Sequence, residues 1–239
     1  MAIDQYLRRV YPGTAAEFCE KADKALLAGE KLFIVTANPE IMMHAQQEGD
    51  LDQLLLGEDA TIVPDGISVV KAMRLLGLPA KERITGVDLA EQLLKLAGQQ
   101  GKSVYLLGAK EEVVSALAQK LKAQYPQMEI HYKNGYGKDK DADFREIEAL
   151  QPDLVLVALG VPAQEKLIAR HLERFSKGVF IGVGGSFDVL SGSKRRAPAV
   201  FVKTNTEWLY RILREPSRLC RFYRNNIKFL WQIRREAKR

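Results

Sequence analysis

Residues 32–40 read LFIVTANPE, and this stretch decides the fold class. Four apolar residues in a row lead directly into a polar turn that contains Asn38 and Pro39. A continuous apolar run is typical of a strand that is buried on both faces of a sheet, whereas a half-exposed strand alternates between apolar and polar residues. The stretch therefore predicts a buried strand of a parallel sheet.

The same pattern recurs along the chain. Short apolar runs alternate with amphipathic helical stretches such as 89–97 and 111–125. This alternation predicts an α/β fold with a mostly parallel sheet and helices on both faces. We expect the strands at 32–36, 61–63, 104–107, 129–132, 154–158 and 179–183.

The pattern changes after Gly192. Residues 194–239 contain 14 Lys or Arg against 3 Asp or Glu, a net charge of +11, while the rest of the chain has 22 against 27, a net charge of −5. Helical periodicity without further strands predicts a helical appendage at 194–239, attached to a core at 1–193. Its charge favours an anionic partner, which could be a membrane, a nucleic acid or a phosphate.

The helix expected after Pro216 is amphipathic and basic. This composition is typical of a helix that lies on an anionic membrane, and the alternative is a packed C-terminal helix with a solvated basic face. At about 100° per residue, the apolar face should hold six side chains and the opposite face four basic ones. The apolar set is Leu219, Phe222, Tyr223, Ile227, Leu230 and Ile233, and the basic set is Arg221, Arg224, Lys228 and Arg235.

No apolar run is long enough to span a bilayer, and the N-terminus lacks the apolar stretch of a secretory signal. The two cysteines, Cys19 and Cys220, lie far apart and suggest no disulfide framework, which fits a reducing compartment. We therefore expect a cytoplasmic protein that sits peripherally on the inner face of the cell membrane. The sequence leaves open whether it forms a homo-oligomer.

Polar residues follow two of the predicted strands. Ligands of parallel sheets bind at the carboxyl ends of the strands. Asp65, in the turn VPDG after the second strand, should face that crevice and could act as a general base. Asn38 could orient it or bind the acceptor. The alternatives are a turn or capping role for Asp65 and a helix cap for Asn38.

Glycines follow other strands. Gly108, Gly184 and Gly185 could let backbone amides approach a phosphate, although strand-to-helix turns also need glycine for packing. Asp188 lies in the same segment as the last two, GVGGSFD. This segment departs from the dinucleotide-binding fingerprint, which disfavours a nicotinamide-dependent oxidoreductase.

The sequence gives no plausible metal site. Asp139, Asp141 and Asp143 contain D-x-D twice, a pattern that holds a divalent cation in many glycosyltransferases when it ends an apolar strand. Here the pattern lies in a charged stretch before FREI, so helix capping is favoured. The histidines are scattered, without metal-ligand spacing. We expect neither a metal nor another cofactor.

Seven motifs, in order from about residue 32 to 218, resemble those of the WecG/TagA/CpsF glycosyltransferases. The resemblance implies a Rossmann-like core of its own type, inversion at the anomeric carbon and no required metal. The motifs are TANPEIMMHAQ, VPDGISVV, ERITGVDL, VYLLGA, LVLVALGVPAQEKLI, GVGGSFDVLSGSKRRAP and TEWLYRILREPSR.

The resemblance also implies the reaction. It is transfer of N-acetylmannosamine from UDP to undecaprenyl-diphosphate-linked N-acetylglucosamine, in teichoic acid or other surface polysaccharide synthesis. N-acetylmannosamine uronic acid and glucose stay open as donor sugars. Two other readings are a basic-tailed nucleic-acid-binding protein and a sugar-nucleotide-binding relative without activity, which the intact Asp65 motif disfavours. The expected partners are a UDP-amino sugar, a polyprenyl-diphosphate acceptor and a membrane. We expect no nucleic acid as a partner.

Site residues follow from the same resemblance. Asp65 is implied as the base, with Thr36 and Asn38 beside it. Arg83 is implied to bind UDP, and Gln164 to line the pocket. Four arginines of the appendage, Arg211, Arg214, Arg218 and Arg221, are implied to close over the site. The turns at the strand ends, rather than the resemblance, add Gly108, Gly184, Gly185 and Asp188 to the expected substrate-binding residues.

Overall fold

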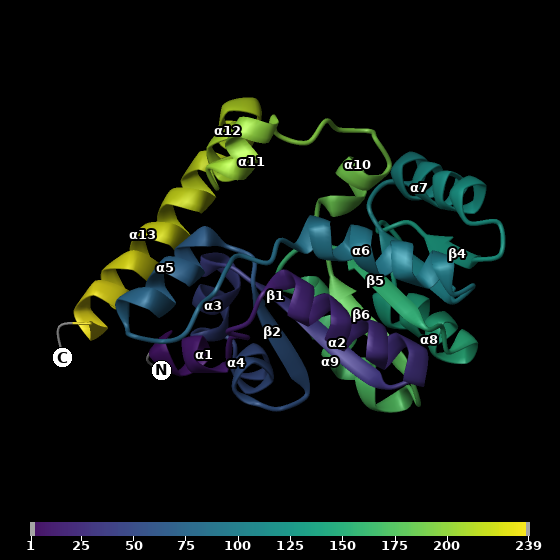
Figure 1. Ribbon diagram of the computed structural model, residues 1–239, viewed down its shortest axis with the longest axis horizontal. Coiled ribbons are helices and arrows are strands. Elements are labelled where there is room, and N and C mark those ends of the chain that lie inside the picture. Colours follow the sequence, from purple (N-terminus) through teal and green to yellow (C-terminus); the bar gives the residue numbers. More distant parts are fainter. Residues whose placement is uncertain (1–2, 238–239) are drawn as a thin grey trace.

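The computed structural model describes residues 3–237 and, at Arg218 and Arg221, only the backbone. Six strands form one sheet in the order β2-β1-β6-β5-β3-β4, and every neighbouring pair is parallel (Figure 1). All six predicted strands and the α/β fold are confirmed. The strands are β1 Lys31–Ala37, β2 Ala60–Pro64, β3 Ser103–Gly108, β4 Glu129–Lys133, β5 Leu154–Ala158 and β6 Gly178–Gly182.

Successive strand residues point into two separate apolar cores. In β1, Phe33 and Val35 join one core, and Leu32 and Ile34 join the other. The first core is covered by α1 Ile3–Arg9, α3 Pro39–Ala45, α4 Gly49–Leu56, α5 Ile67–Leu75, α8 Lys140–Leu150 and α9 Ala163–His171, which leads into the 3-10 turn Leu172–Arg174. The second is covered by α2 Ala15–Ala28, α6 Gly86–Gln99, α7 Glu111–Gln124 and α10 Ser186–Leu190.

Residues 3–30 extend both layers of helices. α1 packs into the first core and α2 into the second. Between them, Val10 forms a single parallel bridge to Ile62 at the edge of the sheet. Thr14 begins α2 with a capping box that is completed by Glu17, so the local sequence fixes where this helix starts.

The appendage folds into α11 Ala199–Lys203, α12 Glu207–Arg214 and α13 Arg218–Glu236. α13 runs from α12 back along the core to α1 (Figure 1). Its Phe229 and Ile233 are completely buried in the first core, together with Ile3 of α1. The last helix therefore shares a core with the sheet.

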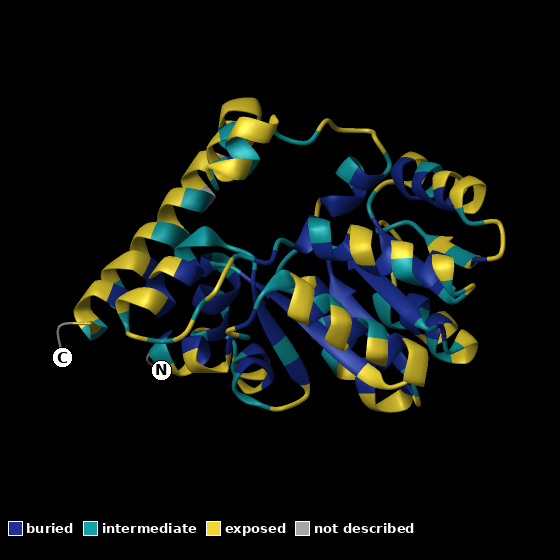
Figure 2. Ribbon diagram, in the orientation of Figure 1, coloured by how far each residue is buried: buried dark blue, intermediate teal, exposed yellow. Residues whose placement is uncertain are grey.

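The predicted apolar face of this last helix is divided between the core, where Ile233 is buried, and the surface. Most of the α13 ribbon is exposed or intermediate (Figure 2). Phe229, which was not assigned to the apolar face, is fully buried, whereas Leu219, Tyr223 and Ile227 are exposed. The physical reason is that α13 carries apolar residues on more than one side. The core accepts only the side that faces α1, α3 and α5.

Glu236 ties the far end of α13 to the first helix. Its two carboxylate oxygens accept hydrogen bonds from the backbone N–H groups of Ile3, at 3.0 Å, and Asp4, at 3.1 Å. N–H groups at a helix start have no partner within the helix, and a carboxylate there also meets the positive end of the helix dipole. One of the few acidic residues of the basic appendage therefore anchors it.

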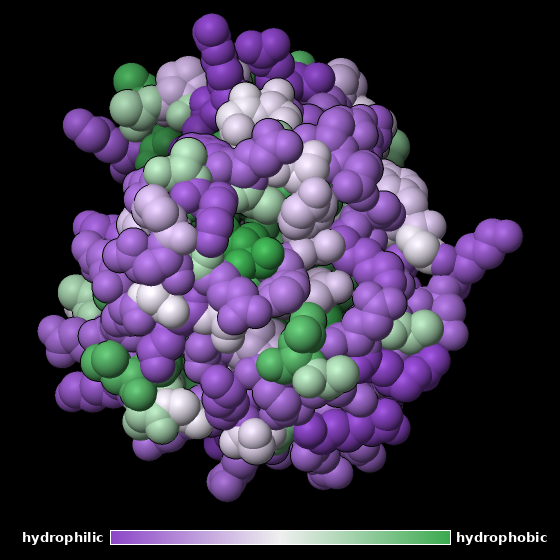
Figure 3. All heavy atoms as spheres, turned by 90° about the vertical axis from the view of Figure 1, so that its right-hand side faces the viewer, coloured by the Kyte–Doolittle hydropathy of each residue, from purple (hydrophilic) through white to green (hydrophobic). Residues whose placement is uncertain are grey.

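The exposed apolar side chains are unevenly distributed. The side of the molecule shown in Figure 3, opposite the end where α13 lies in Figure 1, is mostly hydrophilic, with apolar residues in small separate groups. α13 exposes large apolar side chains along its length: Leu219, Tyr223, Ile227, Leu230 and Trp231. Within residues 3–237, no helix combines the length and apolar character that crossing a bilayer requires.

Candidate active site

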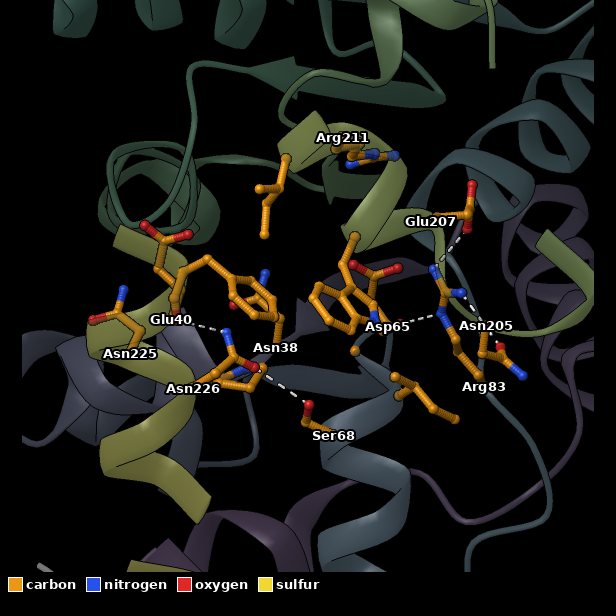
Figure 4. Close-up of a pocket in the computed structure, with 16 residues that line it drawn as sticks. Asn38, Glu40, Asp65, Ser68, Arg83, Asn205, Glu207, Arg211, Asn225 and Asn226 are labelled. Carbon is orange, nitrogen blue, oxygen red and sulfur yellow. Dashed lines mark hydrogen bonds and ion pairs between the residues drawn. The ribbon is translucent and has the colours of Figure 1, made fainter. Parts of the chain in front are cut away.

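Two cavities lie where the strand ends meet the appendage. The first, which we call the amide-lined cavity, has a volume of about 200 Å³ and contains four asparagines (Figure 4). The core contributes the turns after β1 and β2 and the segment before α6, and the appendage contributes α12 and α13. Its polar and aromatic lining consists of Asn38, Glu40, Asp65, Ser68, Arg83, Asn205, Glu207, Trp208, Arg211, Phe222, Asn225 and Asn226.

Asp65 lies at the wall of this cavity, in the turn between β2 and α5. Its backbone N–H donates to the carbonyl oxygen of Ala37 at 2.9 Å, which ties the turn to the end of β1. Its Oδ1 accepts a hydrogen bond from the N–H of Gly86 at 3.0 Å. Because the carboxylate is held in place at the cavity wall, it is suited to take a proton from a bound hydroxyl group.

Asn38 and Thr36, the other two predicted catalytic residues, have different surroundings. Asn38 lines the cavity, and its Oδ1 also caps α3 by accepting from the N–H of Ile41 at 3.1 Å. Thr36 lines neither cavity. It is buried, and its hydroxyl donates to the carbonyl oxygen of Gly182 at 3.3 Å, so it joins β1 to β6 beneath the site.

Arg83 links the turn of Asp65 to the appendage. Its Nε donates to the carbonyl oxygen of Asp65 at 2.6 Å, its Nη2 to Glu207 at 2.9 Å and its Nη1 to Asn205 at 3.3 Å. Glu207 is almost completely buried. The guanidinium of the predicted UDP-binding residue is therefore directed at α12 in this structure.

A second arginine extends this network. Arg196 approaches Glu207 at 3.5 Å and binds Asp88 with both terminal nitrogens, Nη2 at 2.8 Å. Partial burial raises the pKa of Asp88, but hydrogen bonds from Arg196 and Thr85 outweigh it and hold that pKa below its usual range. Asp88 therefore pairs with Arg196 in the first turn of α6, where its backbone N–H donates to the capping Thr85 at 3.2 Å.

The second cavity, which we call the basic cavity, has a volume of about 460 Å³ and lies between α10, the segment 194–197 and α12. Five basic side chains face two acidic ones in its lining, so its local charge is positive. Two predicted residues of the core, Gly185 and Asp188, lie here. The charged residues are Lys194, Arg195, Arg196, Arg211 and Arg214 with Asp188 and Glu215.

Two of the four predicted appendage arginines are placed by the structure. Arg211 lines both cavities, so it lies where they adjoin. Arg214 lines the basic cavity and lies over the ring of Tyr210, 5.7 Å from its centroid. The side chains of Arg218 and Arg221 are outside the described part of the chain.

The other predicted core residues line neither cavity. Gln164 is buried, and its Oε1 accepts from the backbone N–H groups of Gly160, at 3.1 Å, and Gly184, at 3.0 Å. The Gly184 amide is therefore engaged by Gln164. Gly108 has φ of +127°, and a Cβ there would collide with the carbonyl oxygen of Ala158, so close packing of β3 on β5 requires glycine.

Glu165 is a buried acid that sequence reasoning missed. It has no exposed surface, and its Oε1 accepts a hydrogen bond from Nε2 of Gln164 at 2.8 Å. Its Oε2 has no hydrogen-bond partner among the described residues. Burial raises the pKa of Glu165 to about 7, although the Gln164 hydrogen bond lowers it. The bond also fixes which way the Gln164 amide faces.

The D-x-D aspartates have structural partners, and the predicted capping role is confirmed for Asp139. Asp139 caps α8 by accepting from the N–H of Ala142 at 2.9 Å. Asp141 pairs with Arg170 at 2.7 Å, and the buried Asp143 pairs with a lysine. Among the described side chains, no group of three His, Cys, Asp or Glu could hold a metal ion.

Arg211 was predicted, but sequence reasoning missed the other appendage residues that line the amide-lined cavity. A signal for Glu207 was present, because it is one of only 3 acids among 14 bases in residues 194–239. An acidic residue in such a basic segment suggests a buried ion pair. A signal for Asn225 and Asn226 was their adjacency inside a helix, where asparagine is unfavourable. The missed lining residues also include Asn205, Trp208 and Phe222 of the appendage and Ser68 of the core.

Comparison with known proteins gives a family match over nearly the whole chain. The sequence profile of the glycosyl transferase WecG/TagA/CpsF family matches residues 6–239. That range includes both cavities and all of the appendage that lines them.

Individual relatives carry one name, N-acetylglucosaminyldiphosphoundecaprenol N-acetyl-beta-D-mannosaminyltransferase. The protein of Bacillus spizizenii strain W23 is 43% identical over 187 residues, which is 78% of this chain and 72% of the relative. That of Staphylococcus aureus strain MW2 is 40% identical over 191 residues, 80% of this chain and 75% of the relative. That of Bacillus subtilis strain 168 is 40% identical over 186 residues, with 77% and 72% covered.

Proposed function

Because the chain belongs to the WecG/TagA/CpsF family of glycosyltransferases, we propose that it transfers N-acetylmannosamine from UDP to N-acetylglucosamine on undecaprenyl diphosphate. Its relatives are named for this sugar and this acceptor. The product would serve the synthesis of teichoic acid or a similar surface polysaccharide. By itself, the positive charge of the appendage would also fit a nucleic-acid partner. In this proposal its anionic partners are the diphosphate and the membrane.

The observation that carries the proposal is that a fixed carboxylate and a basic cavity lie on two sides of Arg211. Asp65 lines the amide-lined cavity, and the basic cavity adjoins it at Arg211. Direct displacement at a sugar carbon needs a base for the attacking hydroxyl on one side and stabilisation of the leaving group on the other. The two cavities can supply these functions separately.

The reaction proceeds as one displacement with inversion. The acceptor hydroxyl oxygen forms a bond to the anomeric carbon while the bond from that carbon to the UDP oxygen breaks. The hydroxyl proton passes to Asp65, and UDP leaves with the bonding electron pair. The base needs to be within hydrogen-bond reach of the hydroxyl, and its place at the cavity wall permits this.

The leaving diphosphate belongs in the basic cavity. Negative charge develops on it as the bond breaks, and positive side chains that are already in place stabilise that charge. Arg211 and Arg214 are the donors that α12 supplies. With these cations as the stabilising groups, we propose that the transfer needs no metal ion.

Contact with a membrane is a further part of the proposal. The acceptor carries a polyprenyl chain, so the active site has to work at a bilayer surface. α13 exposes a row of large apolar side chains, among them Ile227 and Trp231, next to basic residues such as Arg224 and Lys228. A helix of this kind binds an anionic interface through buried apolar surface and electrostatic attraction.

The test is incubation of the full chain with a soluble short-chain prenyl-diphosphate N-acetylglucosamine acceptor and one UDP-sugar at a time. The panel holds UDP-linked N-acetylmannosamine, its uronic acid and glucose. We expect UDP release and a disaccharide product with the first donor. Product with another donor only would replace the proposed sugar, and no product with any donor would overturn the proposed reaction.

A further inference from the structure

We infer that the amide-lined cavity is the binding site for the terminal amino-sugar ring of the acceptor, and that Asn225 and the Trp208–Phe222 pair of the appendage recognise that ring. The inference rests on the proposed function, because it names the residues that read the acceptor of that reaction. It assigns to the appendage a role in sugar recognition, separate from its arginines and from its exposed apolar surface.

The size of the cavity favours one sugar ring. Pockets for drug-sized ligands usually have about 300–1,000 Å³. The amide-lined cavity, at about 200 Å³, lies below that range, whereas the basic cavity, at about 460 Å³, lies within it. A nucleotide sugar therefore fits the basic cavity, and a single monosaccharide fits the other.

The polar groups of the cavity suit a neutral, hydroxyl-rich ligand. Sugar hydroxyls both donate and accept hydrogen bonds, and a carboxamide side chain offers both functions. Asn226 is partly engaged, since its Oδ1 accepts from the Ser68 hydroxyl at 3.3 Å and its Nδ2 donates to the Phe222 carbonyl oxygen at 3.0 Å (Figure 4). The side chain of Asn225, half-buried at the cavity, forms no hydrogen bond with any described residue.

The place of these asparagines in α13 is costly without a ligand. α13 extends over Arg218–Glu236, so both residues lie well inside it. Asparagine is among the poorer helix formers, so each one in a helix interior destabilises the helix relative to alanine. Two asparagines stand in succession at the cavity wall, and one of them has no hydrogen-bond partner among the described residues. This indicates that their amide groups bind a ligand there.

An aromatic surface stands beside these amides. The rings of Trp208 and Phe222 stack in parallel, with centroids 4.7 Å apart and planes 4° apart, and both residues line the cavity. A pyranose ring has an apolar face of C–H groups, which packs well on an aromatic side chain. The pair joins α12 to α13, so the two helices hold the amides and the aromatic surface in one rigid arrangement.

The position of the base completes the assignment. Asp65 and Asn38 lie at the core wall of the same cavity, and Asn225 and Asn226 lie on the appendage wall (Figure 4). A sugar ring between these walls would present a hydroxyl group to Asp65. The diphosphate and prenyl chain attached to the ring would extend along the appendage, toward the exposed face of α13.

The test is the variant Asn225→Ala, compared with wild type on the soluble prenyl-diphosphate N-acetylglucosamine acceptor. Alanine favours the helix, so a functional loss cannot come from unfolding of α13. We expect KM for the acceptor to rise about tenfold, equal to about 1.4 kcal/mol. KM for the UDP-sugar should stay within about twofold. Trp208→Leu, which keeps bulk but removes the ring, should act in the same direction.

Cys220→Ala is the matched control, because Cys220 is exposed on α13 and does not line the cavity. It should change neither KM. An unchanged acceptor KM in Asn225→Ala, or a rise confined to the UDP-sugar, would overturn the inference. If wild type transfers no sugar, the proposed function fails. Direct titration of the acceptor, without donor, into wild type and Asn225→Ala then tests the binding site by itself. Binding that weakens in Asn225→Ala supports the site, and equal or absent binding refutes it.

Discussion

The Nη2 of Arg83 donates to the buried carboxylate of Glu207 at 2.9 Å, while the Nε of the same guanidinium donates to the carbonyl oxygen of Asp65. One side chain thus joins the turn that holds the proposed base to the first long helix of the appendage. Glu207 also approaches Arg196, which binds Asp88. The cavity between core and appendage therefore depends on an ion-pair network with a single buried acid at its centre.

Replacing Glu207 by Gln should loosen the appendage without unfolding the sheet. Breaking a buried pair costs about 3–5 kcal/mol, and we expect about 2 kcal/mol here because Arg83 is partly exposed. Hydrogen exchange should become faster in residues 199–214 and stay unchanged in β1 and β6. Glu91→Gln, on the exposed side of α6, is the control. Unchanged exchange in 199–214 would show that the network does not hold the appendage.

Glu165 should make stability depend on pH. Its pKa in the folded protein, about 7, lies above the ordinary 4.5, so folding favours the protonated form. The stability that it contributes is complete below about pH 4.5 and is lost as pH rises through about 7. Wild type should therefore lose up to about 3 kcal/mol relative to Glu165→Gln between pH 5 and pH 8. Urea unfolding of both proteins at each pH measures this, and parallel curves would contradict it.

The strands and the place of Asp65 could be read from the sequence because both are local features. A continuous apolar run that ends in VPDG needs no distant partner to be recognised. The buried side of α13 could not be read in this way. Its apolar residues occupy more than one side, and contacts with α1, α3 and α5 decide that Phe229 is buried and Ile227 is exposed.

Contacts between residues that lie far apart in the sequence could not be predicted from local patterns either. Gln164 lies 20 positions before Gly184, and only the parallel arrangement of β5 and β6 brings its amide to the Gly184 N–H. Arg83 and Glu207 are separated by 124 positions. A motif indicates that such residues matter, but the folded chain is needed to show what each one touches.

The exposed apolar surface of α13 should bind anionic vesicles. We expect the double substitution Ile227→Ser and Leu230→Ser to weaken co-sedimentation with vesicles that contain phosphatidylglycerol, since both side chains are exposed and free to enter an interface. Binding should also fall as salt rises, because the basic residues act through screened charges. Leu27→Ser, at an exposed site on α2, is the control. Equal binding by the double variant would remove α13 as the membrane contact.

Sugar transfer should persist in excess EDTA. The D-x-D carboxylates are engaged by a helix N-terminus, Arg170 and Lys133, and the basic cavity supplies cations for the leaving diphosphate. We expect the rate of UDP release to stay within about twofold of the untreated enzyme. Loss of turnover that Mg²⁺ or Mn²⁺ restores would show that a metal ion takes part.

The central claim is that Asp65 is the base of an inverting transfer, and product analysis of Asp65→Asn tests it most directly. Asparagine can still accept the Gly86 hydrogen bond through its side-chain oxygen, so the turn and UDP binding should survive. Wild type should form a product whose new glycosidic bond has the opposite anomeric configuration to the UDP-sugar. Asp65→Asn should form the same product about 10²–10⁴-fold more slowly, because it lacks a positioned proton acceptor. Near-normal turnover of Asp65→Asn, or a product with retained configuration, would contradict the account.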